Sequence, residues 1–348
     1  MVFWSVFVFL ALLSGCGLIR VRTGSRLHFG LLNLPSHDDE EDREPTSTGS
    51  KDRQFGGVGM MVTEPGISLV VQPAAAWRAE GPLADRALAF ARQVQKALPG
   101  TPIPPQHLVI ESCAREHAGL GTGTQLGLAI AGALGRLAGM DHLPAEELAG
   151  LVGRGVRSAL GIHGFAQGGF LVEAGKRRPR DISPLVARFA VPESWRMVVL
   201  VPADAKGLHG VHERNAFRRL EACKQARTSV NALCRLIVLE LLPALADQDL
   251  KEFGRALYEF NLRVGRIFAL VQGGTYSHPH TQEIVSFIRK QDVPGTGQSS
   301  WGPSVFAVVE DLPKALWLRA RLQSRFGLVA SEIILSSPAN HGADIEVS

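Results

Sequence analysis

Residues 117–126 read His117-Ala118-Gly119-Leu120-Gly121-Thr122-Gly123-Thr124-Gln125-Leu126. Apolar residues then recur at i, i+3 and i+4 spacing as far as Leu137, which predicts an amphipathic helix over 125–137. An apolar run at 107–113 predicts a strand before the loop. Glycines let backbone N–H groups approach an anion, and a helix N-terminus adds its dipole and its free amides. We therefore predict that residues 119–124 bind phosphate, with a plain helix-starting turn as the alternative.

Two familiar phosphate motifs do not match this loop. The dinucleotide pattern needs glycine at position 124, where this chain has threonine. The mononucleotide P-loop needs Gly-Lys-Ser/Thr, which the loop lacks. The sequence therefore indicates a third type of phosphate loop.

Polar residues alternate with apolar ones in an early strand pattern. Arg26 and His28 are separated by one residue, so both side chains lie on one face of a strand. On a buried face this pair needs an anionic partner, whereas on a solvated face it needs none. Both interpretations stay open at this point.

A second basic group lies in a stretch without acids. No Asp or Glu occurs from Leu148 to Val172, a stretch that contains Arg154, Arg157 and His163. Arginine suits bidentate recognition of phosphate or carboxylate. We expect a helix over 144–160 and a glycine-rich turn over 161–169. The alternative is two solvated arginines on a helix surface and a histidine that is satisfied within a turn.

A late glycine- and serine-rich loop spans residues 294–303. A tryptophan among small residues is unusual for a flexible connection, so we expect this loop to close over the site. Its candidate residues are Gly297, Gln298, Ser299, Ser300 and Trp301.

Length and composition limit the class of protein. The 348 residues, 45% of them hydrophobic, predict two packed domains, which we place at 19–180 and 190–348 with an α+β fold. An acidic segment at 36–53 is predicted to be a disordered surface loop. A net charge of +4 without a basic stripe argues against nucleic acid as a partner. Four cysteines without a CxxC motif argue against structural zinc and against a disulfide scaffold.

The first residues differ from the rest of the chain. Residues 1–18 are uncharged and end near Leu13-Ser14-Gly15-Cys16, which resembles a lipoprotein cleavage box. A signal peptide begins with positive charge, and none precedes Arg20. We favour a start codon assigned too early, with a cytoplasmic chain that begins near Leu18 and has no stable membrane association. A membrane-anchored lipoprotein attached through Cys16 is the alternative.

Other elements are predicted more coarsely. We expect a strand over 20–33 with a turn at Gly24, short strands within 55–71, a helix over 82–98 and a strand at 170–173. In the second half we expect strands at 197–201, 304–309 and 329–335, and helices at 211–242, 247–270, 281–290 and 313–326. The histidine pairs at 209/212 and 278/280 lack a third ligand nearby, so surface positions are favoured over a metal site.

Taken together, these motifs resemble the GHMP kinase superfamily, and within it the beta-ribofuranosylaminobenzene 5-phosphate synthase family. The resemblance covers residues 25–303 in the expected order. It rests on residues 25–30, 55–59, 117–126, 153–158, 161–170 and 297–303.

The resemblance implies a two-domain fold with the active site between the domains. It implies a transferase that condenses phosphoribosyl pyrophosphate with 4-amino- or 4-hydroxybenzoate, releasing pyrophosphate and carbon dioxide, in tetrahydromethanopterin biosynthesis and so in one-carbon metabolism. It also implies Mg²⁺ and a homodimer. The glycine loop, Arg154 and Arg157 would then neutralise the leaving pyrophosphate, and Arg26 or His28 would hold the benzoate carboxylate.

Two departures bear on the alternatives. Kinases of the superfamily generally carry an acid near residues 161–165, and this chain has none there. The paired acids of common phosphoribosyltransferases are also missing. An ATP-dependent small-molecule kinase of the same fold is the first alternative, and a non-catalytic ligand-binding lipoprotein is the second.

Overall fold

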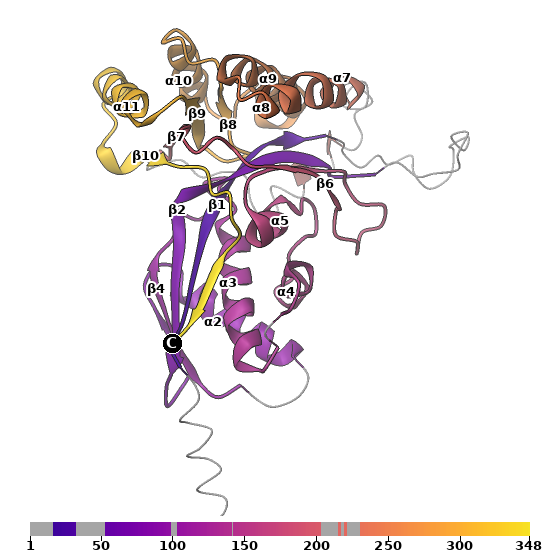
Figure 1. The fold of residues 1–348 in the computed structure, drawn as a ribbon, viewed down its shortest axis with the longest axis vertical. Helices are drawn as coiled ribbons and strands as arrows, with labels where there is room; N and C mark the ends of the chain where they lie inside the picture. The colour runs from indigo at the N-terminus through magenta and orange to yellow at the C-terminus, as the bar shows by residue number, and fades with distance from the viewer. Residues whose placement is uncertain are drawn as a thin grey trace, which may run out of the picture.

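A computed structural model describes residues 17–32, 53–98, 103–140, 142–202, 215–216, 219–220 and 230–348. The described residues form two β-sheets with helices packed on them, so the predicted α+β fold is confirmed (Figure 1). Most of residues 1–18 and 36–53, together with the 209/212 histidine pair, lie outside the described residues.

The first sheet has seven strands. Its main path runs β11-β1-β2-β4-β3, and β5 extends it by pairing with both β2 and β6. The strands are β1 (Ile19–Leu31), β2 (Gly57–Pro73), β3 (Arg78–Glu80), β4 (Gln106–Ser112), β5 (Phe170–Glu173), β6 (Leu185–Phe189) and β11 (Asp344–Val347).

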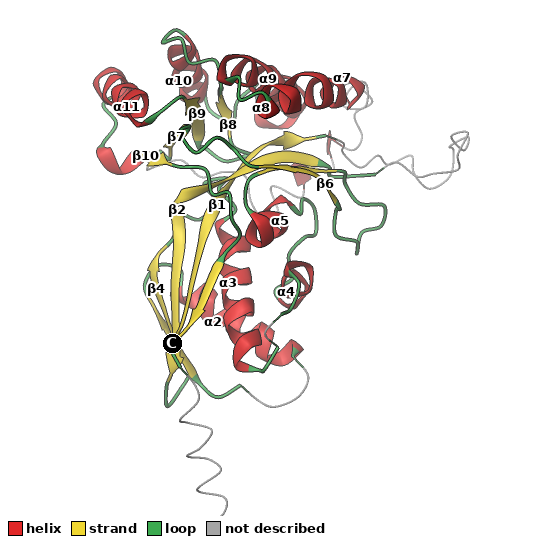
Figure 2. Ribbon diagram, viewed as in Figure 1, coloured by secondary structure: helices red, strands yellow, loops and turns green. Residues whose placement is uncertain are grey.

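Helices cover one face of this sheet. Figure 2 shows them stacked beside the yellow strands in the lower half of the molecule. A core forms where apolar residues of β1, β2 and β4 meet the buried stripe of the second helix in this layer. The helices are α2 (Ala84–Ala97), α3 (Thr122–Leu137), α4 (Ala145–Leu151) and α5 (Leu160–Gln167).

The second sheet has four strands in the order β10-β7-β9-β8. Its strands are β7 (Arg196–Leu200), β8 (Thr296–Gln298), β9 (Val305–Val309) and β10 (Ile333–Ser336). Its helices are α7 (Val230–Leu236), α8 (Leu242–Ala246), α9 (Leu250–Gln272), α10 (Pro279–Arg289) and α11 (Leu312–Phe326).

One hydrophobic core joins the two sheets. Phe29 of β1 packs against Phe170 of β5 and Phe306 of β9, with ring centroids 6.1 and 4.9 Å away. Buried residues of α9 complete this core. The upper half of β1 is therefore fixed against the second sheet, which Figure 1 shows lying above it.

The early strands are longer than we predicted. The turn expected at Gly24 is instead an irregularity in the register between Thr23 and Ser25, and β1 continues through it. The short strands expected within 55–71 form the single 17-residue strand β2. A β-bulge absorbs one extra residue without ending a strand, and a composition pattern does not distinguish it from a turn.

The single helix predicted over 144–160 is wrong. The chain forms α4, leaves the helix at Val152 and enters α5 at Leu160. Gly153 and Gly155 have φ angles of +62° and +83°, which a right-handed helix does not contain. Arg154 and Arg157 therefore lie on a loop. The turn predicted over 161–169 is mostly α5, in which Gly164 permits close packing: a Cβ there would lie 2.3 Å from the sulfur of Met61.

The long helix predicted over 211–242 is described only in part. Within its described part, a π-helical segment (Ile237–Leu241) follows α7 and interrupts the regular α-helix. Pro243 is the second residue of α8, and its missing N–H cannot make an ordinary helical hydrogen bond to the preceding turn.

The last strand belongs to the first sheet. β11 pairs antiparallel with β1, placing Val347 opposite Ile19. The sheets therefore divide the chain differently from our boundaries, because the end of the 190–348 segment completes the sheet of the 19–180 segment. Within the described ranges, no helix is both long and apolar enough to cross a bilayer.

Candidate active site

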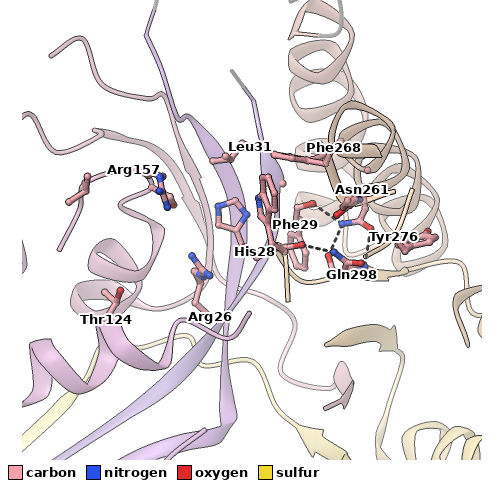
Figure 3. Close-up of a pocket in the computed structure, with 18 of the residues that line it drawn as sticks. Arg26, His28, Phe29, Leu31, Thr124, Arg157, Asn261, Phe268, Tyr276 and Gln298 are labelled. Atoms are coloured by element: carbon pink, nitrogen blue, oxygen red, sulfur yellow. Dashed lines mark hydrogen bonds between the residues drawn. The ribbon is translucent and has the colours of Figure 1, made fainter. Parts of the chain in front are cut away.

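A cavity of about 290 Å³ lies where the two sheets meet. Its lining comes from β1, the start of α3, the 153–158 loop, α9 and the late loop (Figure 3). Segments far apart in the sequence thus converge on one pocket. The predicted site residues that line it are Arg26, His28, Thr124, Arg154, Arg157, Gln298, Ser300 and Trp301.

Hydrogen bonds tie three of the predicted motifs together. The N–H of Arg26 donates to the carbonyl of Leu120 at 2.9 Å. The hydroxyl of Ser299 donates to the carbonyl of Gly119 at 2.8 Å and accepts from the N–H of His28 at 3.0 Å. The late loop is therefore fastened to both β1 and the glycine loop.

The glycine loop needs its glycines for close packing. A Cβ on Gly119 would lie 2.3 Å from the carbonyl oxygen of Ser299, and Gly119 has a φ of +85°. Of the six residues predicted to bind phosphate, only Thr124 lines the cavity. The backbone at Gly121 and Gly123 lies beside it: a Cβ there would be 3.5 Å from Nε of Arg26 and 3.3 Å from Nη2 of Arg154, respectively.

Positive charge dominates one side of the cavity. Arg26, Arg154 and Arg157 line it, and none of its lining residues is Asp or Glu. Figure 3 shows Arg26 and Arg157 extending toward the space around the ring of His28. Guanidinium groups without an acid among the lining residues favour an anionic ligand, phosphate or carboxylate above all.

Arg154 is held in an unusual environment. Its guanidinium stacks 5.1 Å from the ring centre of Phe90, and its Nε is buried without a hydrogen-bond partner among the described residues. Burial, together with the nearby charge of Arg86, lowers the pKa of Arg154 to about 10. The group still carries its charge at neutral pH, and its buried Nε–H gives it a donor for an anion.

Arg86 was not predicted as a site residue. It lies on α2 and forms an ion pair with Glu116. A Cβ on Gly123 would lie 2.4 Å from its Nη2, so Arg86 and Arg154 flank the start of α3. Burial lowers the pKa of Arg86. An arginine within an amphipathic helix carries no local signal of this placement.

His28 is buried in the cavity wall, with 4% of its surface exposed. Its Nδ1 has no hydrogen-bond partner among the described residues. Burial and the adjacent Arg26 charge hold the pKa of His28 well below its usual value. The imidazole is therefore neutral near pH 7. In the cavity without a ligand Arg26 is thus the charged member of the pair, and the expectation that Arg26 or His28 holds a carboxylate stays a prediction.

The opposite side of the cavity carries an apolar and aromatic patch beside polar residues such as Asn261, Tyr276 and Gln298. Val264 and Phe268 of α9 line it together with Trp301, and the Phe268 and Trp301 rings meet edge to face at 4.7 Å. Such a surface suits a planar aromatic group. The late loop thus contributes an aromatic wall, while its role in closing over a ligand stays a prediction.

Asn261 connects the two domains at the floor of the cavity. Its amide Nδ2 donates to the carbonyls of Phe29 and Gln298 at 2.8 and 2.9 Å, and its Oδ1 accepts from the N–H of Gln298 at 3.0 Å. Gly297 is needed beside it, because a Cβ there would lie 2.2 Å from Oδ1. A sequence signal existed: Asn261 interrupts the apolar face of its helix.

His163 does not line the cavity. It is buried on α5, where its Nε2 lies 2.7 Å from the carbonyl oxygen of Ser183 and its Nδ1 lies 3.6 Å from Glu146. The structure therefore places this residue in a polar network behind the pocket. Its predicted catalytic role has no geometric basis in the described site.

The donor set does not fit a protein-held magnesium ion. Mg²⁺ is usually bound by one or two carboxylates together with substrate phosphates, and no carboxylate lines this cavity. The described residues contain no group of three or more His, Cys, Asp or Glu side chains that could hold a metal. His278 and His280 stack on each other, and the Nδ1 of His278 accepts from the N–H of His280 at the start of α10.

Sequence comparisons match both halves of the chain. The GHMP kinases N terminal domain matches residues 85–169, and the GHMP kinases C terminal domain matches residues 241–327. A beta-ribofuranosylphenol 5'-phosphate synthase of Methanothermobacter thermautotrophicus is 29% identical over 84% of this chain and 89% of its own. The protein of the same name from Archaeoglobus fulgidus is 29% identical over 95% of this chain and its whole length.

Solved structures share the fold. Mevalonate diphosphate decarboxylase from Staphylococcus aureus superposes with a TM-score of 0.65 at 14% identity, covering 96% of this chain and 99% of that one. Homoserine kinase from Cytophaga hutchinsonii gives 0.63 at 15% identity, covering 95% and 98%. At these identities the likeness concerns the fold alone.

Proposed function

We propose that this chain, which matches the GHMP kinases N terminal and C terminal domains, is a decarboxylating pentosyltransferase-like synthase. Its donor is phosphoribosyl pyrophosphate and its acceptor is a 4-substituted benzoate. The relatives' name contains a phenol, which favours 4-hydroxybenzoate over 4-aminobenzoate. The product is an aromatic C-riboside phosphate, which we assign to tetrahydromethanopterin biosynthesis in the cytoplasm.

One observation carries this proposal: the same cavity has a basic side without acids and an aromatic side. The three arginines suit a pyrophosphate and a carboxylate. The Val264, Phe268 and Trp301 surface suits the ring of a benzoate. A donor and an acceptor with these chemistries would meet at the centre of the pocket, close to Arg26 and His28.

The reaction balances without a redox partner. The bond between the ribose anomeric carbon and pyrophosphate breaks, and its electron pair leaves with pyrophosphate. The ring carbon that carries the carboxylate bonds to the anomeric carbon. Carbon dioxide then leaves, and the electron pair of its bond to the ring restores aromaticity.

The residues divide this work. Arg154, Arg157 and the start of α3 would stabilise the charge that develops on the leaving pyrophosphate. Arg26 would hold the carboxylate until it departs. The apolar wall would orient the ring and exclude water, which would otherwise compete for the anomeric carbon.

The kinase alternative is not favoured. Phosphoryl transfer to an alcohol commonly uses a carboxylate that accepts the hydroxyl proton. The residues that line the cavity include no carboxylate. Glu173, the first acid that follows the 153–158 loop in the sequence, accepts a hydrogen bond from the N–H of Ala159. We propose that Mg²⁺ binds together with the phosphates of the phosphoribosyl donor and not at a site made by the protein alone.

The test follows labelled carbon dioxide. Purified protein is incubated with magnesium, phosphoribosyl pyrophosphate and carboxyl-labelled 4-hydroxybenzoate or 4-aminobenzoate. We expect release that needs both substrates and is faster with the hydroxy acid. No release with either acid, from folded protein that turns over ATP, would instead establish the kinase.

Two variants test the assignment of the arginines. Arg154→Ala and Arg157→Ala should each lower kcat/KM for the donor at least 100-fold, since a charge-assisted bond to a group that gains charge is lost. Arg178→Ala, exposed on the surface, is the matched control and should keep wild-type kinetics. Unchanged affinity and turnover in both pocket variants would refute the assignment.

A further inference from the structure

Two buried charged residues lie behind the 153–158 loop and have no part in the chemistry described above. Glu173 at the end of β5 has no exposed surface, and Lys176 is 4% exposed. Burying an ammonium or a carboxylate costs free energy unless polar partners replace water. Their partners therefore indicate what these two residues do.

Lys176 holds the middle of the loop. Its ammonium donates to the carbonyls of Gly155 at 3.3 Å, of Val156 and of Pro179 at 2.9 Å. Its own backbone is fixed by two hydrogen bonds with Gln54, at 2.9 and 2.8 Å. The ammonium therefore holds two successive carbonyls of the loop in one orientation.

The planar peptide group makes this contact directional. The N–H of a trans peptide points opposite to its carbonyl. With the carbonyls of Gly155 and Val156 turned to Lys176, the N–H groups of Val156 and Arg157 are turned away from it. Since all of residues 153–158 line the cavity, this orientation also controls where their side chains point.

Glu173 holds the end of the loop. Its Oε2 accepts from the N–H of Ala159 at 2.7 Å, while its Oε1 is buried without a hydrogen-bond partner among the described residues. Burial raises the pKa of Glu173, while the Ala159 N–H and the nearby hydroxyls of Ser158 and Ser183 oppose that shift. The last residue of β5 and a residue three positions after it therefore supply the two anchors.

The loop needs such anchors because of its glycines. Gly153 and Gly155 both have positive φ angles, and glycine gives a segment more conformational freedom than any other residue. Within the loop, the N–H of Arg154 bonds to the carbonyl of Ala149, which fixes only its first part.

We propose that Lys176 and Glu173 are positioning residues, which fix the 153–158 loop so that Arg154 and Arg157 face the phosphate groups of the donor. This inference rests on the proposed function for the identity of the donor. The claim that the two anchors orient the arginines concerns any phosphate-like anion in the cavity, so binding of pyrophosphate alone can test it.

The experiment measures pyrophosphate binding by calorimetry in Lys176→Met and Lys176→Arg. Arg177→Met, adjacent and exposed, is the matched control. We expect the Kd for pyrophosphate to rise at least tenfold in Lys176→Met, to recover in part in Lys176→Arg and to stay unchanged in Arg177→Met. Amide exchange of residues 153–159 should accelerate in Lys176→Met only.

Kinetics separate positioning from general damage. In Lys176→Met the KM for phosphoribosyl pyrophosphate should rise at least tenfold, while the KM for the aromatic acid stays within twofold. An equal rise in both KM values would overturn the inference, because damage to the whole pocket weakens both substrates.

Two further outcomes are decisive. A folded Lys176→Met protein that binds pyrophosphate as tightly as the wild type would overturn the inference. If that variant does not fold, Glu173→Met tests the other anchor by the same binding measurement, and full affinity there would overturn it. Wild-type protein that binds pyrophosphate but makes no product would refute the proposed function alone.

Discussion

At the scale of single residues, the cavity depends on which groups carry charge. Arg26 and His28 are two residues apart on one face of β1, and only the arginine is charged near pH 7. The neutral imidazole is a consequence of its burial beside a cation. A bound anion would reverse part of this effect, since a nearby negative charge raises the pKa of a histidine.

The low pKa of His28 has a consequence for stability. The unfolded chain binds a proton near pH 6.5, whereas the folded protein does so only at much lower pH. The unfolded state thus binds more protons in this window, so folding stability falls as pH falls below 6.5. The slope for one proton is at most about 1.4 kcal/mol per pH unit.

Urea unfolding at pH 7.5, 6.5 and 5.5 checks this prediction. His28→Gln should lose less stability than the wild type between pH 6.5 and 5.5, by up to the slope above. His280→Gln, whose side chain is 71% exposed, is the control and should follow the wild type. Identical pH dependence in His28→Gln and the wild type would show that the residue protonates freely when folded.

At the scale of elements, the 153–158 loop is the part of the site most sensitive to backbone geometry. A Cβ on Gly155 would lie 2.5 Å from Cδ1 of Ile182, and the φ of +83° is unfavourable for any other residue. By contrast, Gly150 lies within α4 with nothing within 4 Å of an added Cβ.

The two glycines therefore predict opposite results. Gly155→Ala should weaken pyrophosphate binding roughly tenfold and lower the melting temperature, because the loop must shift to remove the clash. Gly150→Ala should keep full binding and gain up to about 1 kcal/mol of stability from better helix propensity. Calorimetry and thermal unfolding measure both effects. Equal behaviour of the two variants would contradict the loop geometry.

Local patterns in the sequence predicted much of the site. Alternation in one strand placed Arg26 and His28 together, and the acid-free stretch pointed to Arg154 and Arg157. The residues that sequence reasoning missed depend on distant partners: Asn261 bonds to Phe29, 232 positions away. No local period encodes such a contact. The acid-free stretch that contains Arg154 and Arg157 was wrongly predicted as one continuous helix. The positive φ angles of Gly153 and Gly155, which end the helical conformation there, are not visible in the sequence pattern.

At the scale of the whole molecule, Asn261 is a central contact between the two sheets. It is 5% exposed, and it satisfies backbone groups of β1 and β8 at once. A buried backbone group left without a partner costs about 1–3 kcal/mol. This single amide therefore links the stability of the fold to the shape of the cavity floor.

Asn261→Leu should destabilise the protein by several kcal/mol, since it leaves the Phe29 carbonyl and the Gln298 N–H and carbonyl without this partner. Arg266→Leu, exposed on the same helix, is the control and should change stability by less than about 0.5 kcal/mol. Urea unfolding monitored by circular dichroism measures both. A small effect at Asn261 would show that water replaces the lost bonds.

The pairing of β11 with β1 affects how the protein is made. Ile19 emerges from the ribosome early, but its neighbour Val347 is among the last of these residues to be translated. During synthesis one edge of β1 is therefore left exposed while more than 300 further residues are added. The edge of β1 that pairs with β11 must therefore wait until residues 344–347 have been made, so a nascent-chain chaperone that covers this edge would protect the protein from aggregation during that interval.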